Sequence, residues 1–103
     1  MNQQPKYRRI LLKLSGEALA NGLKDSILDF AFIDQVAAVL KKCLEAGVEI
    51  GIVVGAGNIW RGRQGPAANM DAVTADQMGM LGTVINCLAM RDAVQRAGGK
   101  AVV

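Results

Sequence analysis

The stretch Val48-Glu-Ile-Gly-Ile-Val-Val54, followed at once by Gly55-Ala56-Gly57, decides how this 103-residue chain folds. It is short, rich in β-branched residues and closed by a glycine turn, which indicates a buried strand rather than a helix. Upstream, Arg9-Ile-Leu-Leu-Lys-Leu14 ends in the same way at Ser15-Gly16 and predicts another buried strand. We therefore expect two strands, each of which leads into a glycine-rich turn.

The segment between these strands predicts an amphipathic helix. Its apolar residues recur at helical spacing from Ile33 to Leu44, Asp29 stands at the N-cap position, and Gly47 is placed to end the helix. A strand, a helix and a second strand within this length imply parallel strands joined by a right-handed crossover. The sequence thus predicts the α/β class with a mainly parallel sheet.

The last part of the chain predicts a long helix and the start of a further strand. One stripe of this helix carries Met78, Leu81, Ile85 and Leu88. Thr74 and Gln77 are spaced as a capping box, so the helix should begin near Thr74 or a few residues earlier and end at Gly98-Gly99. Lys100-Ala-Val-Val103 begins like a strand whose far face nothing covers, so we expect residues 1–103 to be the N-terminal part of a longer domain.

Composition narrows the class of protein. Hydrophobic residues make up 51% of the chain and charged residues 20%, which is typical of a globular domain. The net charge of +3 suits an anionic ligand, whereas an aromatic content of 4% argues against a nucleic-acid partner. No stretch approaches the roughly 18 apolar residues that span a bilayer, so we expect no membrane partner and a cytoplasmic location.

The cysteines and the absence of histidine limit the chemistry. Cys43 and Cys87 lie in apolar periodic segments without CxxC spacing, which predicts buried thiols and no metal site. Without any histidine, acid–base work falls to carboxylates and lysines.

The two glycine turns carry the strongest chemical signal. Ligands in open parallel sheets bind at the carboxyl ends of strands, so both turns should face one crevice. Glycine lets backbone N–H groups approach a phosphate, and Lys13 and Arg61 can neutralise its charge. Taken singly, each turn is equally well explained as a tight connection. Neither turn matches GxxxxGK[ST], and Gly55-x-Gly57 continues to Trp60 where a dinucleotide-binding motif needs a third glycine.

Several other residues allow more than one interpretation. Asp76 can cap the long helix or accept hydrogen bonds from sugar hydroxyls, and capping is the commoner role for such a residue. Trp60 can stack on a base, although packing is commoner for a lone tryptophan. Glu17, Lys24 and Asp25 read as a solvated connection, and the methionines read as core or interface filler.

Three blocks in this order resemble the bacterial uridylate kinases, which have the amino acid kinase fold. The blocks are Arg9-Ile-Leu-Leu-Lys-Leu-Ser-Gly-Glu-Ala18, Gly55-Ala-Gly-Asn-Ile-Trp-Arg-Gly62 and Asp76-Gln-Met-Gly-Met-Leu-Gly-Thr83 with Asn86 to Asp92. The resemblance implies a three-layer αβα sandwich, phosphoryl transfer from ATP to UMP with Mg²⁺, and a homo-oligomer, which is a hexamer in relatives.

The resemblance also implies roles for individual residues. Four of these match a turn that binds ATP phosphates: Lys13, Leu14, Ser15 and Gly16. Gly57 and Arg61 match phosphate contacts, and Lys13 and Arg61 are the expected catalytic residues. Ala56 matches a backbone contact to UMP, and Asp76 matches the residue that binds the UMP ribose, which makes capping its second reading.

The chain departs from the family pattern in two places. The family commonly has three consecutive glycines where this chain has Gly55-Ala56-Gly57, and alanine tolerates a positive φ poorly. In relatives, the segment that corresponds to the connection from Leu19 to Leu28 contributes to regulation by GTP. In this chain the connection is short and has a different composition, so we do not expect the same regulation.

Two alternatives stay open. The chain can belong to a related enzyme that phosphorylates a carboxylate or carbamate, or it can be a non-catalytic nucleotide-binding or assembly fragment. Because the family continues well beyond this length, we expect the isolated chain to lack activity. We also expect Met80, Val84 and Cys87 to pack against another subunit.

Overall fold

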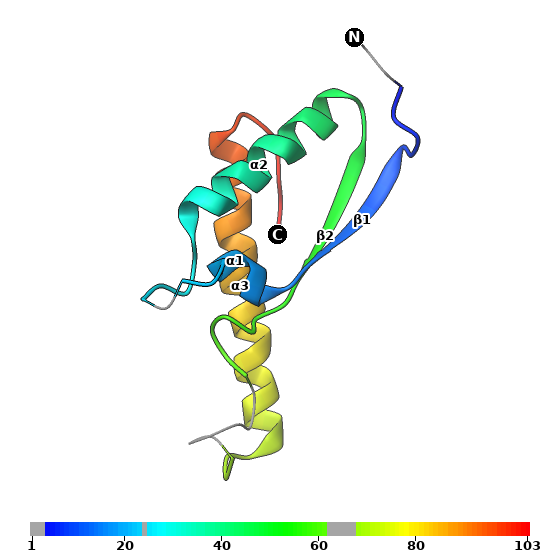
Figure 1. The fold of residues 1–103 in the computed structure, drawn as a ribbon. Helices are drawn as coiled ribbons and strands as arrows, with labels where there is room; N and C mark the ends of the chain where they lie inside the picture. The colour runs from blue at the N-terminus through cyan, green and yellow to red at the C-terminus, as the bar shows by residue number, and fades with distance from the viewer. Residues whose placement is uncertain (1–3, 24, 62–67) are drawn as a thin grey trace.

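The computed structural model describes residues 4–23, 25–61 and 68–103, so Lys24 and Gly62 of the sequence patterns lie outside it. The elements, in chain order, are β1 (Arg9–Leu14), α1 (Gly16–Ala20), α2 (Phe30–Glu45), β2 (Glu49–Val54) and α3 (Ala72–Arg96). The helices lie on one side of the two strands, and α3 extends well beyond the end of the sheet (Figure 1).

The two strands form the parallel pair that the sequence predicts. The register runs from Arg9 opposite Glu49 to Leu14 opposite Val54, so both strands end at the same edge. The intervening α2 makes the connection between parallel strands, which cannot be a tight hairpin. The α/β class and the parallel sheet are therefore confirmed.

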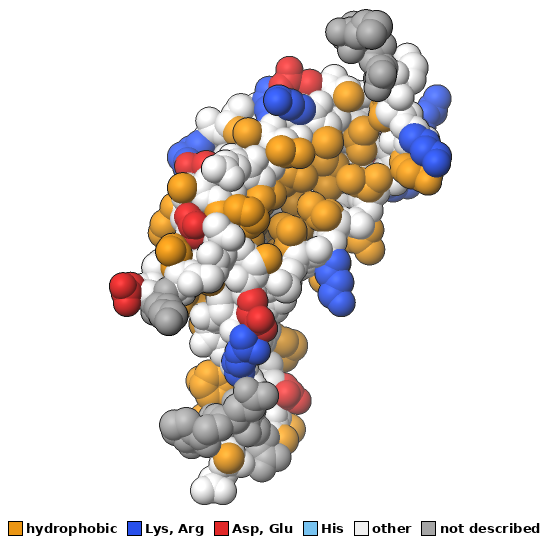
Figure 2. Space-filling model, in the orientation of Figure 1, with side chains coloured by type: hydrophobic (Ala, Val, Ile, Leu, Met, Phe, Trp, Pro, Cys, Tyr) orange, Lys and Arg blue, Asp and Glu red, His pale blue; other side chains and the backbone are white. Residues whose placement is uncertain are grey.

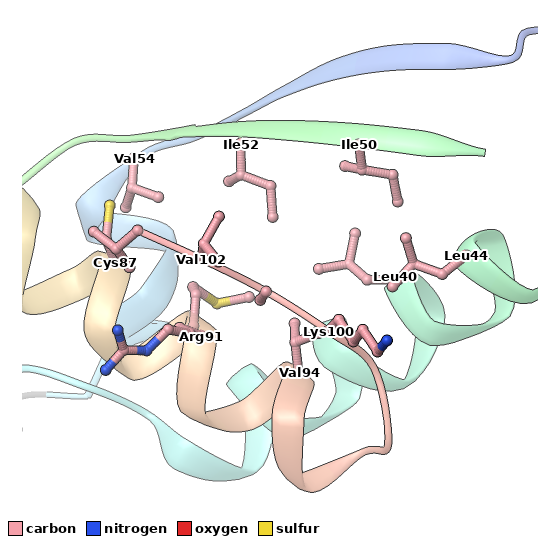
Figure 3. Close-up of a pocket in the computed structure, with 13 residues that line it drawn as sticks. Leu40, Leu44, Ile50, Ile52, Val54, Cys87, Arg91, Val94, Lys100 and Val102 are labelled. Atoms are coloured by element: carbon pink, nitrogen blue, oxygen red, sulfur yellow. The ribbon is translucent and has the colours of Figure 1, made fainter.

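Only one face of this sheet is covered within the described residues. Ile50, Ile52 and Val54 point from β2 toward the helices (Figure 3). Residues on the opposite face, such as Leu11 and Val53, are exposed. The prediction of strands buried on both faces was wrong for this part of the chain, because its helices form a single layer.

Both ends of α2 are set by the residues that the sequence indicates. The carboxylate of Asp29 accepts a hydrogen bond from the Phe32 N–H at 3.1 Å and caps the helix. The helix ends at Glu45, and Gly47 follows with a φ of 90°, a conformation that favours glycine.

The helix α3 begins at Ala72, a few residues before Thr74 as predicted, but its cap differs from the prediction. Asp71 caps the helix, because its carboxylate accepts from both the backbone N–H and the hydroxyl of Thr74 at 3.0 Å. Thr74 is therefore a donor inside the first turn, and the expected capping box of Thr74 and Gln77 is wrong. The predicted end is confirmed, since the helix stops at Arg96 and Gly98 has a φ of 97°.

The buried face of α3 consists mainly of small residues. The buried residues are Ala75, Gly82, Asn86, Met90, Ala93 and Val94. The predicted stripe of Met78, Leu81, Ile85 and Leu88 is instead 38–65% exposed. None of the helices in the described part of the chain combines the length and apolar character needed to cross a bilayer.

The core lies between α2, α3 and the inner face of β2. Ile33, Ala37 and Leu40 of α2 are buried there together with Met90 of α3. Cys87 packs against this core but is only partly buried, as is Cys43, so the prediction of two buried thiols was wrong. Each cysteine lies at the border of its helix's buried face, where periodicity alone does not fix the extent of burial.

The C-terminal segment is not a strand. Residues 101–103 are without regular structure, and the sheet contains β1 and β2 alone among the described residues. The segment instead lines one side of an apolar groove of about 530 Å³ between β2 and the helices, where Val102 and Val103 stay exposed (Figure 3). Figure 2 shows the hydrophobic side chains that gather at this face. The predicted strand was wrong here because the segment pairs with no neighbouring backbone in a ladder.

Candidate functional site

The two glycine turns meet at the carboxyl edge of the sheet. The Gly55 N–H donates to the Leu14 carbonyl at 3.0 Å, which joins the ends of both strands. Gly16 then lies so close to the second turn that an added Cβ would stand 2.6 Å from the Gly57 nitrogen and 2.7 Å from the Gly55 oxygen. Only glycine fits at Gly16, and the predicted common location of the two turns is confirmed.

The first turn leads into α1, which the sequence analysis missed. Ser15 is the N-cap, and its Oγ accepts from the Ala18 N–H at 3.1 Å. The helix ends at Ala20, and its C-cap Asn21 has a φ of 50°. A serine followed by Glu17 is a usable signal for a helix start, but only five residues follow before the helix ends, and so short a segment has no readable periodicity.

The second turn is compact and accommodates alanine without strain. The Ala56 carbonyl accepts from the N–H groups of Ile59 and Trp60, both at 2.9 Å. Within the described residues, Asn21 is the only non-glycine residue with positive φ, so Ala56 does not need the conformation that alanine avoids. Gly57 has an ordinary φ, and an added Cβ would stand 3.0 Å from Oε1 of Glu17, so a larger residue there would shift this half-exposed side chain by a few tenths of an ångström.

A pair of amides, of which Asn86 is buried and Asn58 partly buried, fixes the second turn to α3. The Asn86 amide donates to the Gly55 carbonyl at 2.7 Å and to Asn58 Oδ1 at 2.8 Å. The Asn58 amide donates to Asn86 Oδ1 at 3.1 Å and to the Ile27 carbonyl at 2.7 Å. Sequence reasoning singled out neither asparagine, because an isolated asparagine in a helix has no local pattern that reveals a partner 31 residues away.

Arg61 and Glu17 form an ion pair at the mouth of a polar hollow. The guanidinium lies 2.8 Å from Oε1 of Glu17, and both side chains are about half exposed. The hollow has a volume of about 620 Å³ and is lined by Glu17, Ala20, Gly22, Leu23, Asp25, Ser26, Ile27, Gly57, Asn58 and Arg61. Glu17 therefore belongs to the candidate site, whereas its position in the sequence suggested a solvated connection.

Lys13 lies at the same edge with its amine available. It is exposed near the end of β1, and its side chain has no ion-pair or hydrogen-bond partner among the residues that the structure describes. The neighbouring Leu14 packs against the core, which leaves only its backbone for contact with a ligand. Ser15 is exposed, and its hydroxyl can donate while it accepts from Ala18.

Asp76 stands apart from the hollow. It is an exposed residue inside α3, and Asp71 already occupies the capping position, so Asp76 does not cap the helix. Its closest link to the site is its neighbour Ala75, whose carbonyl accepts from Trp60 Nε1 at 2.8 Å. This bond gives Trp60 the packing role that the sequence favoured. The geometry brings Gly57, Arg61 and the first turn together, but not Asp76.

Metal ligands are sparse in the described segments. No group of three carboxylate or cysteine side chains converges there. Mg²⁺ usually keeps several waters and binds one or two carboxylates together with substrate phosphates.

Known proteins give an independent view of the chain. It is 50% identical over 101 residues to the uridylate kinases of Ectopseudomonas mendocina and Stutzerimonas stutzeri. Among solved structures, it is similar to the UMP kinase of Ureaplasma parvum, with a TM-score of 0.78, 36% identity and 94% of this chain covered. The Bacillus anthracis UMP kinase gives a TM-score of 0.74 with 38% identity over 87% of this chain.

These relatives are longer than the chain. The match covers 98% of this chain but 40% of each curated relative, and 36–40% of the two solved chains. Residues 8–103, which include both strands, both glycine turns and α3, match the amino acid kinase family. The chain therefore belongs to the amino acid kinase family.

Proposed function

We propose that the protein to which this chain contributes transfers the γ-phosphoryl group of ATP to UMP, giving UDP and ADP. One observation carries the proposal: two glycine turns, Lys13 and Arg61 lie at the same edge of a parallel sheet. The similarity to uridylate kinases, which includes both turns, supports the choice of UMP.

In this proposal the chain's residues position and neutralise phosphates. Backbone groups from Leu14 to Gly16 hold the ATP phosphates, and the Lys13 amine stabilises the charge of the phosphoryl group in transfer. Phosphoryl transfer needs mainly positioning and electrostatic stabilisation, so no side-chain nucleophile is required. Mg²⁺ would arrive on the ATP phosphates, which supply the ligands that the described side chains lack.

UMP would lie on the side of the second turn. Gly57 and Arg61 would contact its phosphate, the Ala56 backbone would contact the nucleotide, and Asp76 would accept hydrogen bonds from the ribose hydroxyls. Asp76 is available for this, because it is exposed and Asp71 caps the helix.

The proposal also includes a homo-oligomer. Met80, Leu81 and Val84 are exposed on α3 together with other apolar residues. A contiguous apolar face of this kind is typical of a protein–protein contact. Cys87 is removed from the expected contact, because it packs against the core of its own chain.

The activity can be tested in a completed enzyme, in which residues 1–103 replace the matched segment of the Ectopseudomonas mendocina uridylate kinase. Formation of ADP from ATP and Mg²⁺ is measured with UMP, with other nucleoside monophosphates, and with aspartate, acetylglutamate and carbamate. We expect turnover with UMP. A folded protein that uses a carboxylate or carbamate and not UMP would show that the related-enzyme alternative is right.

The isolated 103-residue chain is the matched control for this experiment. The residues that the structure describes offer phosphate turns and one candidate ribose contact but no evident pocket for either base, and binding of these remote groups helps to align the reacting atoms. We expect no measurable turnover from it. Turnover near that of the completed enzyme would refute the view that this chain holds only part of the site.

A further inference from the structure

We propose that Asn86 is a positioning residue for phosphoryl transfer, which acts by holding the second glycine turn in place from inside α3. The inference deepens the proposed function and rests on it for its kinetic part. Asn86 does not face the hollow, and it would act through Gly55 and Asn58.

The bonding of this pair is complete. Asn86 is fully buried and is the only buried polar residue in the described part of the chain. Both N–H groups of its amide and both of the Asn58 amide have acceptors, at distances of 2.7–3.1 Å. No buried side-chain nitrogen or oxygen in the described residues lacks a partner. A fully satisfied buried network fixes one arrangement of the groups that it joins.

The position of Asn86 gives this arrangement a specific use. Its neighbours on the buried face of α3, Gly82, Met90 and Ala93, are small or apolar, so packing alone would accept an apolar residue there. A buried amide instead needs partners, because leaving one without hydrogen bonds is costly. The partners of Asn86 are groups of the glycine turn, and the turn is thereby tied to the longest helix.

The amide pair also supports the first glycine turn. An added Cβ on Gly16 would stand 2.6 Å from Asn58 Oδ1, so Asn58 lies directly against the first turn. Asn58 further reaches the Ile27 carbonyl, on the segment that leads into α2. A shift of the pair would therefore move both turns relative to each other. A misplacement of about 1 Å in a catalytic site can lower the rate about a hundredfold.

The kinetic test compares two variants of the completed enzyme. Asn86→Asp keeps the size of the side chain but replaces the amide nitrogen with oxygen, so the Gly55 carbonyl and Asn58 Oδ1 lose their donor. Met90→Ala removes a buried side chain further along the same helix face, with 3% exposure and no hydrogen bond to the turn. We expect Asn86→Asp to lower kcat/KM about a hundredfold, while Met90→Ala keeps it near the original value below its own unfolding midpoint.

A second readout uses Trp60 in the 103-residue chain, of which it is the only tryptophan. Its backbone bonds to Ala56 and its indole to Ala75, so its emission reports the position of the turn. We expect a red shift of the emission maximum in Asn86→Asp but not in Met90→Ala. Asn58→Ser removes the amide of the partly buried member of the same pair. We expect it to give the same red shift and the same loss of kcat/KM as Asn86→Asp.

The outcomes separate this inference from the proposed function. If the unsubstituted completed enzyme does not use UMP while the Trp60 shift is observed, the proposed function and the kinetic role fail together, but the structural hold on the turn stands. If UMP turnover is present and Asn86→Asp and Asn58→Ser leave kcat/KM unchanged, the inference is wrong. It is also wrong if Met90→Ala loses as much kcat/KM at an equal folded fraction, since any change on the buried face of α3 would then have the same effect as loss of the amide.

Discussion

The guanidinium of Arg61 is already paired before any ligand arrives. Glu17 lies 2.8 Å away, so a phosphate must share Arg61 with this carboxylate or displace it. Because both side chains are about half exposed, the pair contributes little to stability, and a doubly charged phosphate can compete for the arginine. Arg61 is therefore available as a phosphate ligand despite its pairing.

We expect Arg61→Ala to lower kcat/KM of the completed enzyme at least about tenfold, because a charge-assisted hydrogen bond to phosphate is worth roughly 1.5–3 kcal/mol. Arg9→Ala is the matched control, since Arg9 pairs with Glu49 in an exposed position at the other end of β1. Steady-state kinetics with UMP and ATP measure both. Unchanged kinetics in Arg61→Ala would remove Arg61 from the site.

Asp76→Asn should raise the KM for UMP more than the KM for ATP, because the carboxylate is proposed to accept from the ribose hydroxyls. The unfolding midpoint should change little, since Asp71 and not Asp76 caps the helix. Asp92→Asn, on the same helix, serves as the control for the loss of a negative charge. Equal changes of KM for both nucleotides would contradict the ribose role.

The side chain of Ala56 occupies the space that a side chain at Gly82 would need. A Cβ on Gly82 would lie 2.9 Å from the Ala56 Cβ, whereas a Cβ on Gly79 would meet only the Trp60 ring, at 3.6 Å. Replacing glycine by alanine inside a helix stabilises by about 1 kcal/mol when space allows. We expect Gly79→Ala to raise the unfolding midpoint of the 103-residue chain and Gly82→Ala to lower it.

The double variant Ala56→Gly with Gly82→Ala should recover the stability that Gly82→Ala loses. Thermal or denaturant unfolding of the two single variants and the double variant gives a coupling energy, expected at roughly 0.5–3 kcal/mol for residues in contact. Additive effects would show that the two side chains do not compete for the same space.

Among single residues, the sequence could predict the site residues that belong to a local pattern. Gly16, Gly57 and Arg61 belong to glycine turns that follow strands, and the structure brings them together. Glu17 and Asn86 could not be found in this way. Their importance comes from partners distant in sequence, Arg61 and Gly55, which become neighbours only after folding.

The helices are delimited by side chains that cap them, and α2 shows the effect of pH most clearly. The Asn21 amide donates to the carboxylate of Asp29 at 3.1 Å, and the Phe32 N–H donates as well. These hydrogen bonds, that of Asn21 first, lower the pKa of Asp29 below its ordinary value of 3.8. Because the folded pKa is depressed, the resulting stability is present above pH 3.8 and is lost as the pH falls through the folded value.

Asp29→Ala should therefore lower the unfolding midpoint of the chain at pH 7, and the difference from the unsubstituted chain should shrink as the pH falls below 3.8. Asp25→Ala is the control, because Asp25 is exposed and makes no side-chain hydrogen bond among the described residues. Circular dichroism melts over the acid range measure both. A difference that persists undiminished at low pH would exclude the charge of Asp29 as its cause.

Elements were predictable from sequence where periodicity and caps agree. The bounds of α2 and the end of α3 follow from Asp29, Gly47 and Gly98, which act within one turn of the helix. The buried face of α3 could not be predicted from hydrophobicity. Its close contacts with the second turn require small residues such as Gly82, so the most apolar stripe lies on the opposite side.

The exposed apolar stripe of α3 bears on the oligomeric state of the whole molecule. We expect the completed enzyme to be an oligomer, and Leu81→Asp to weaken its assembly, because Leu81 is 65% exposed between other exposed apolar residues. Val39→Asp on α2 is the control, as Val39 is similarly exposed but lies on another helix. Light scattering measures the mass of each variant. A monomeric unsubstituted enzyme would contradict the expectation.

The fold class was predictable at the scale of the whole molecule because strand, helix and strand follow one another at lengths that permit a parallel connection. The course of residues 100–103 was not. Their composition favours a strand, but a strand exists only where a neighbouring backbone supplies hydrogen bonds, and local composition cannot show whether such a neighbour is present.

The register of β1 with β2 has a consequence for synthesis of the protein. Arg9 and Glu49 lie opposite each other although they are 40 residues apart in the chain. At about 5–20 residues per second, β1 leaves the ribosome roughly 2–8 s before its partner emerges. During that interval its apolar side chains and backbone hydrogen-bonding groups have no strand to pair with. The nascent chain should therefore bind a chaperone over Ile10 to Leu14 until β2 has emerged.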